Sequence, residues 1–201
     1  KYIEAVYEPR AHLASTFANF VQSDASCFAV VGDSGSGKSC WICDTALRYL
    51  QSGHPVLFYR ANDIEKGIFK AICEDLNWSF SPHYDEVQAV KRLLEVFRQD
   101  TILVFIDGFD EIPIDLARRA IDDFLKRVDG KRMKLIATCK TTVWDDLLER
   151  NGNPTRLSNK VFTVDGARGC ILRGFADQEF PHVLEKYSIF YQYFRPFEIE
   201  V

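Results

Sequence analysis

One eight-residue segment limits the folds open to this chain more than any other feature. Residues Gly32 to Ser39 read Gly-Asp-Ser-Gly-Ser-Gly-Lys-Ser, which matches the pattern G-x-x-x-x-G-K-[ST]. The segment follows the apolar run 27–31 and precedes residues 40–50, which contain neither glycine nor proline. A strand, a glycine-rich turn and a helix in this order are typical of a phosphate-binding loop.

Each part of the loop has a chemical reason to bind phosphate. Glycines let the backbone curl so that successive N–H groups face phosphate oxygens, and the following helix adds the positive end of its dipole. Lys38 can reach the β- and γ-phosphates, and the Ser39 hydroxyl can ligate Mg²⁺. The alternative is a serine- and glycine-rich turn without a ligand. The predicted nucleotide-binding residues of this segment are Gly32, Asp33, Ser34, Gly35, Ser36, Gly37, Lys38, Ser39 and Cys40.

The composition is that of an ordinary globular protein. Of the 201 residues, 47% are hydrophobic and 27% are charged, and the net charge is −4. This charge gives no indication of a nucleic-acid partner, and no stretch approaches the roughly 20 apolar residues of a membrane span. Most of the six cysteines fall in predicted core elements, which favours reduced thiols in a cytoplasmic protein. Cys40 and Cys43 lie three residues apart, but a zinc site would need a second pair.

Strand-like and helix-like segments alternate along the chain. Strands are predicted at residues 27–31, 56–59, 101–106, 134–138, 161–164 and 170–172. Helices are predicted at residues 10–22, 40–51, 63–76, 86–98, 115–128 and 143–150, and Asp177 is the predicted cap of a final helix. This alternation predicts an α/β fold, a three-layer P-loop NTPase sandwich with a mainly parallel five-stranded sheet.

The same patterns suggest how the chain is divided. We expect a lead-in segment and helix over residues 1–26, the P-loop core over 27–175, and the start of a helical subdomain over 176–201. The chain begins at Lys1 and ends in an apolar stretch, so we expect it to be a segment of a longer protein.

Acidic residues follow the third predicted strand. Asp107 ends the apolar run 101–106, and ligands gather outside the carboxyl ends of parallel strands. Asp107 is therefore the predicted Mg²⁺ ligand together with Ser39. Asp110 and Glu111 come directly afterwards, and either can polarise an attacking water as a general base; the alternative is that they cap the next helix. The predicted catalytic residues are Lys38, Glu111 and Asp110.

The run Asp-Gly-Phe-Asp-Glu at 107–111 resembles the second nucleotide motif of NACHT-type ATPases, a branch of the STAND class of signal-transducing P-loop NTPases. Residues 134–140 are similar to the family's next strand, whose tip usually reads Thr-Ser-Arg. Thr138 matches this tip, whereas Cys139 differs. Lys140 stands at the arginine position; it keeps the positive charge but cannot bind two oxygens at once as a guanidinium group does. The alternative is that Thr138 merely ends the strand and Lys140 is a solvated charge.

The resemblance extends to the lead-in and implies a function. Glu8-Pro9-Arg10 is similar to a short motif that lies near the adenine in many STAND proteins, which adds Arg10 and Lys140 to the predicted nucleotide-binding residues. The family implies a slow Mg²⁺-dependent ATPase that acts as a switch in signalling or antiviral defence. Its ATP- or ADP-bound state would control self-oligomerisation, with effector and sensor domains in the same full-length chain.

Two alternatives to this switch remain open. The first is a scaffold that binds ATP or ADP with negligible turnover. The second is an AAA+ ATPase of the replication-initiator type, which would require a basic DNA-binding module that residues 1–201 do not show.

Overall fold

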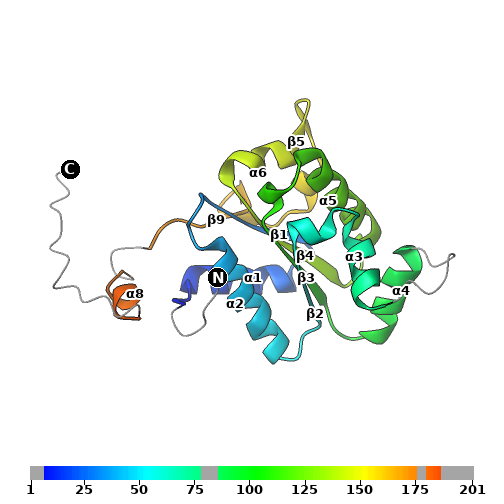
Figure 1. The fold of residues 1–201 in the computed structure, drawn as a ribbon, viewed down its shortest axis with the longest axis horizontal. Helices are drawn as coiled ribbons and strands as arrows, with labels where there is room; N and C mark the ends of the chain where they lie inside the picture. The colour runs from blue at the N-terminus through cyan, green and yellow to red at the C-terminus, as the bar shows by residue number, and fades with distance from the viewer. Residues whose placement is uncertain (1–6, 78–85, 176–179, 187–201) are drawn as a thin grey trace.

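The computed structural model describes residues 7–77, 86–175 and 180–186. Its centre is a parallel sheet of five strands in the order β2-β3-β4-β1-β9 (Figure 1). The strands are β1 (Cys27–Val31), β2 (Val56–Arg60), β3 (Ile102–Asp107), β4 (Met133–Cys139) and β9 (Cys170–Ile171). The predicted α/β fold with a five-stranded sheet is therefore confirmed.

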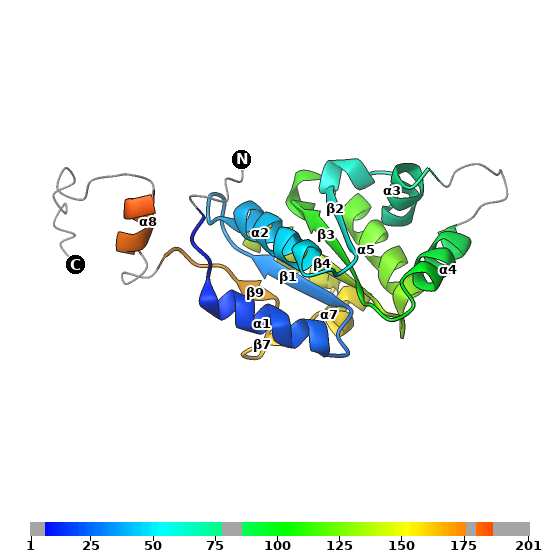
Figure 2. The same cartoon turned by 90° about the horizontal axis from the view of Figure 1, so that it is seen from below.

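Helices cover both faces of this sheet and make it the middle of three layers (Figure 2). One face packs against α1 (Ala11–Gln22) and α2 (Lys38–Gln51). The other packs against α3 (Ile68–Asp75), α4 (Glu86–Val96), α5 (Ile114–Val128), α6 (Thr141–Leu148) and α7 (Arg156–Lys160). Strands β1, β3 and β4 are buried on both faces, which explains why they are continuous apolar runs in the sequence.

The alternation of side chains along each strand divides the core into two clusters. Phe28 and Val30 of β1 pack with α1 and α2, whereas Cys27, Ala29 and Val31 face the opposite helices. The first cluster is rich in aromatic rings: Phe17 of α1 lies edge-on to Phe28 at 5.3 Å between ring centroids. This cluster fixes the lead-in helix to the core that carries the phosphate-binding loop.

A buried lysine also joins α1 to the sheet. Lys134 of β4 is 8% exposed, and its Nζ donates hydrogen bonds to the carbonyl oxygens of Phe20, Ser23 and Ala25 at 3.0, 2.5 and 2.9 Å. Burial lowers the pKa of this ammonium group. Three carbonyl partners at the carboxyl end of α1 explain how a lysine is accommodated within a core strand.

Short elements complete the structure. They are the 3₁₀ turns η2 (Ala61–Ile64) and η3 (Phe109–Glu111), the hairpin strands β5 (Glu149–Arg150), β6 (Asn153–Pro154), β7 (Thr163–Val164) and β8 (Ala167–Arg168), and α8 (Phe180–Lys186). No helix in the three described ranges is long and apolar enough to span a bilayer.

The structure differs from the predicted elements in three places. The helix predicted over 63–76 is divided into η2 and α3, because Gly67 has a φ of 108° that a helix cannot contain. Of the strand-like segments 161–164 and 170–172, only the second joins the main sheet; the first contributes one bridge from Val161 and the β7–β8 hairpin. The β5–β6 hairpin and α7 are absent from the predicted elements. Asp177, the predicted cap, lies outside the described residues.

Candidate nucleotide-binding site

The phosphate-binding loop connects β1 to α2, and its glycines are required by its geometry. Gly35 and Gly37 have φ values of 80° and 95°, in the left-handed region that favours glycine. A Cβ on Gly32 would lie 2.7 Å from the carbonyl oxygen of Leu172, just beyond β9, and 2.9 Å from Ser36 Oγ. The loop therefore has the tight curl that the sequence motif predicts.

Two polar side chains of the loop are placed to meet a ligand, and one of them has no hydrogen-bond partner among the described residues. Lys38 Nζ donates to the carbonyl oxygens of Gly32 and Asp33, both at 2.8 Å, so its side chain folds back across the loop. Ser36 Oγ is buried and has no hydrogen-bond partner among the described residues. An ammonium group over glycine-rich backbone, with a buried hydroxyl beside it, is a donor set that fits phosphate oxygens.

The strand order brings the tip of β4 between the loop and the tip of β3. Gly32 N–H donates to the Cys139 carbonyl oxygen at 3.3 Å, which joins the loop to β4. On the other side of β4, Thr138 is fully buried; its Oγ1 accepts the Gly108 N–H at 2.8 Å and donates to Asp107 Oδ1 at 2.5 Å. Thr138 therefore fixes the orientation of the Asp107 carboxylate. Sequence reasoning noted Thr138 only through a resemblance and did not assign it to the site.

Asp110 and Glu111 lie in η3 but have different surroundings. The Asp110 side chain is only 7% exposed; it accepts the Lys140 N–H at 2.9 Å and pairs with Lys140 Nζ at 3.1 Å. The exposed Glu111 side chain makes no hydrogen bond or ion pair with the described part of the chain. A Cβ on Gly108 would lie 2.8 Å from Glu111 Cδ, so the Glu111 carboxyl group folds back over Gly108. Asp110 thus connects η3 to Lys140, which follows β4, whereas the Glu111 carboxyl group lies over Gly108 and stays exposed.

Two buried or partly buried thiols sense the charges of these groups. Burial, with a smaller contribution from Asp110, raises the pKa of the Cys139 thiol to about 12, while Lys38 and Lys140 act in the opposite direction. Burial also raises the pKa of the Cys43 thiol on α2, with a further contribution from the Asp107 carboxylate. The loop, the start of α2 and the tips of β3 and β4 are therefore close enough to interact.

Arg10, in the lead-in before α1, contacts the segment that follows β9. Its guanidinium carbon is 3.4 Å from the centroid of the Phe175 ring, and its Nη1 donates to the Gly174 carbonyl oxygen at 3.2 Å. Arg10 also lines a small pocket together with Tyr7 of the lead-in and residues of α1 and α2, among them Trp41. The structure thus places Arg10 between the lead-in, α2 and the segment after β9.

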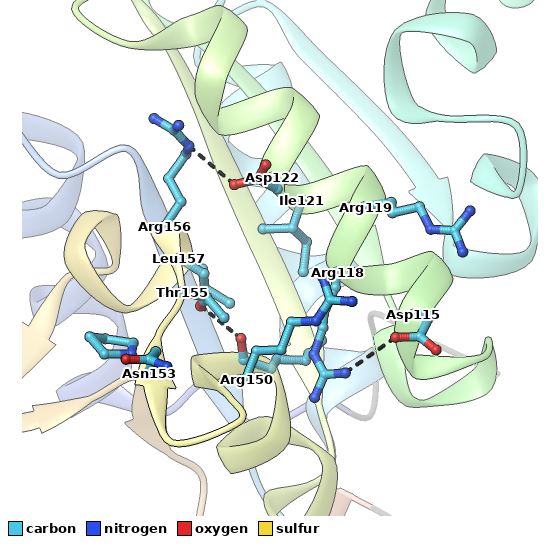
Figure 3. Close-up of a pocket in the computed structure, with 12 residues that line it drawn as sticks. Asp115, Arg118, Arg119, Ile121, Asp122, Arg150, Asn153, Thr155, Arg156 and Leu157 are labelled. Atoms are coloured by element: carbon cyan, nitrogen blue, oxygen red, sulfur yellow. Dashed lines mark hydrogen bonds and ion pairs between the residues drawn. The ribbon is translucent and has the colours of Figure 1, made fainter.

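A separate pocket of about 470 Å³ lies between α5, α6, the β5–β6 hairpin and α7 (Figure 3). Arg118 extends into it and donates to the Asp146 carbonyl oxygen from Nε at 3.1 Å and from Nη2 at 2.6 Å. Arg156 pairs with Asp122 at 3.1 Å. None of the predicted site residues lines this pocket, so it is not part of the candidate site.

Replacing Thr138 tests the connection between the strand tips. Thr138→Val keeps the shape of the side chain but leaves the buried Gly108 N–H without an acceptor, which should cost about 1–3 kcal/mol. We expect a lower free energy of unfolding in urea titrations. Thr138→Ser keeps the hydroxyl and should lose less stability. A larger loss in Thr138→Ser than in Thr138→Val would show that the methyl group, and not the hydrogen bonds, is what matters.

Comparison with known proteins identifies the architecture. No protein-family description and no curated protein matches this chain. Among solved structures, Orc1 of Aeropyrum pernix in complex with DNA aligns at 14% identity and a TM-score of 0.58, over 92% of this chain and 51% of that one. Cdc6p of Pyrobaculum aerophilum aligns at 15% identity and a TM-score of 0.58, over 91% and 51%. The fold is that of the P-loop NTPases.

A third structure with this P-loop NTPase fold carries a nucleotide analogue. DnaA from Aquifex aeolicus bound to AMPPCP aligns at 12% identity and a TM-score of 0.56, over 91% of this chain and 54% of that one. The present chain therefore spans about half the length of the proteins that it resembles. These neighbours are AAA+ ATPases, and none of the three is a NACHT protein.

Proposed function

We propose that this chain is the ATP-binding and Mg²⁺-dependent ATP-hydrolysing module of a larger protein, and that its nucleotide state acts as a switch. The observation that carries the proposal is the cluster at the carboxyl ends of β1, β3 and β4. There the curled loop and Lys38 lie across the tip of β4 from Asp107, whose carboxylate is held by Thr138. Cationic and N–H donors opposite an oriented carboxylate match what nucleotide phosphates and their metal ion require.

The proposal assigns phosphate binding to the loop and Mg²⁺ binding to Ser39 and Asp107. The N–H groups of the loop and of Cys40 would face the phosphates, and Lys38 would exchange its carbonyl partners for phosphate oxygens. The Ser39 hydroxyl and the Asp107 carboxylate would hold Mg²⁺, a donor set of hard oxygens that suits this ion. When bound, Mg²⁺ supplies a Lewis acid that neutralises charge on the phosphates.

Catalysis is assigned to Glu111, and Asp110 becomes a positioning residue. Glu111 has an exposed carboxylate with no partner in the described structure, so it is free to accept a proton from water. Asp110 is occupied by Lys140, from both the backbone and the ammonium group. Lys140 is the proposed contact to the γ-phosphate. In the ATP state Lys140 would bind that phosphate, and in the ADP state it would pair with Asp110, as it does in this structure.

The remaining assignments follow the family resemblance. Arg10 is proposed to lie on the adenine side, since it borders the pocket between the lead-in and α2. The same proposal includes self-association through the ATPase module. It also includes control of effector and sensor domains in a signalling or defence protein of the STAND type.

A second candidate is an ATPase of the replication-initiator type. It is favoured by the fold likeness to Orc1 in complex with DNA, and to DnaA bound to AMPPCP and single-stranded DNA at 12% identity and a TM-score of 0.51. The net charge of −4 argues against a broad DNA-binding surface on this segment. ATP-dependent binding to duplex or single-stranded DNA at physiological salt would favour this candidate, and nucleotide-dependent self-association without DNA would favour the switch.

Direct biochemistry tests the ATPase proposal. We expect the chain to bind ATP and ADP, measured by calorimetry, and to release phosphate from ATP slowly and only with Mg²⁺. Chelation of the metal should stop the release of phosphate. Binding without any release would leave a nucleotide-binding scaffold, and the absence of binding would refute the proposed site.

A further inference from the structure

Two cysteines beside the phosphate-binding loop differ from the other four. Cys27, Cys73, Cys139 and Cys170 are buried, whereas Cys40 and Cys43 are both partly exposed. They lie in the first two turns of α2, three residues apart, so they share one face of the helix. The two thiols also interact electrostatically, because Cys40 contributes to the raised pKa of Cys43. Among the described residues, this is the one pair of accessible neighbouring thiols.

The geometry allows these thiols to join, but not without moving the helix. In a helix, side chains three apart have Cβ atoms about 5–6 Å from each other, and a disulfide needs about 3.5–4.5 Å. Closing the bond must therefore tighten the start of α2. Lys38 is the first residue of this helix, and Ser39 and Cys40 follow it. The contraction would displace the backbone N–H groups that the proposed function assigns to phosphate.

We propose that Cys40 and Cys43 are a thiol–disulfide pair whose oxidation lowers the affinity of the site for nucleotide. The inference rests on the proposed nucleotide binding and adds a means of regulating it. Cys40 is the residue that reacts first with an oxidant, because it adjoins the exposed Ser39, whereas Cys43 packs partly against the aromatic core cluster. Bound nucleotide would cover Cys40 and protect it from the oxidant.

The chemistry balances with a small disulfide such as oxidised glutathione. The Cys40 sulfur attacks one sulfur of glutathione disulfide, which forms a mixed disulfide and releases one glutathione thiol. The Cys43 sulfur then attacks the Cys40 sulfur, closes the internal disulfide and releases the second glutathione. Two protein thiols are oxidised, one glutathione disulfide is reduced, and the two thiol protons leave on the two glutathione molecules.

Peptide mass spectrometry after trypsin digestion tests whether the two thiols join. Cleavage after Lys38 and Arg48 leaves both cysteines in one peptide, residues 39–48. After treatment with glutathione disulfide, we expect this peptide to be lighter by two hydrogen atoms, and bound ATP to slow the change. Loss of one or two charge-assisted contacts should weaken ATP binding by about tenfold or more, and dithiothreitol should restore it.

Two variants make the result specific. Cys43→Ser should bind ATP normally when reduced and should form only a glutathione adduct at Cys40. Cys73→Ala removes a buried thiol and should oxidise and respond like the wild type. A peptide that stays reduced, or an internal disulfide that leaves the affinity for ATP unchanged, would overturn the inference. A reduced chain that binds no ATP would instead contradict the proposed function; because the peptide mass is read without nucleotide, the two failures are distinguishable.

Discussion

Lys38→Ala is expected to abolish detectable nucleotide binding while leaving the fold intact. Among the described residues, Lys38 Nζ donates hydrogen bonds only to the carbonyl oxygens of Gly32 and Asp33, which belong to the loop itself. A hydrogen bond from a charged group contributes about 1.5–3 kcal/mol, so the loss of two such bonds to phosphate should weaken affinity by about 100-fold or more. Isothermal titration with ATP and with ADP measures this change.

A second lysine variant serves as the matched control. Lys91 is an exposed residue of α4 that pairs with Glu95 at 3.9 Å on the same helix, and such exposed pairs contribute little to stability. Lys91→Ala removes the same charge and should bind nucleotide like the wild type. Both variants should show wild-type circular dichroism and cooperative thermal unfolding. Unchanged affinity in Lys38→Ala would refute the assignment of the loop.

The parts of the site that the sequence predicts are those encoded over a few consecutive residues. The loop at 32–39 requires glycine at fixed positions, and Gly35 and Gly37 indeed have positive φ values. Asp107 ends a buried apolar run, and it lies at the tip of β3 as expected. Local composition and periodicity determine such features, so they can be recognised without knowing how the strands pair.

The parts that the sequence does not predict depend on pairing between distant residues. Thr138 can orient Asp107 only because β4 lies beside β3, and 31 positions separate the two residues. The same pairing brings Lys140 to Asp110, and a sequence pattern cannot tell whether Asp110 or Glu111 is the general base. The short strand β9 is also set by its neighbour β1 rather than by its own two residues. Strand order, and not local propensity, therefore separates the roles of these groups.

Glu111→Gln is expected to lower the rate of phosphate release by about 100-fold or more while nucleotide affinity is kept, since general-base catalysis contributes about 10²–10⁴-fold. The amide has nearly the same shape as the carboxylate but cannot accept the proton of the attacking water. Affinity should persist because Glu111 holds neither phosphate nor metal in the proposed site. Single-turnover phosphate release and calorimetric titration of the same preparation separate the two effects.

Asp110→Asn distinguishes catalysis from positioning, because it makes the same chemical change one residue away. Its amide oxygen can still accept the Lys140 N–H, but the ion pair with Lys140 Nζ is lost. We therefore expect a smaller loss of rate, together with an altered ratio of ATP to ADP affinity, because Lys140 no longer has a competing partner. If Asp110→Asn abolished release and Glu111→Gln did not, the two roles would have to be exchanged. Equal, near-zero release by the wild type and by Glu111→Gln would mean that the chain binds nucleotide without turning it over.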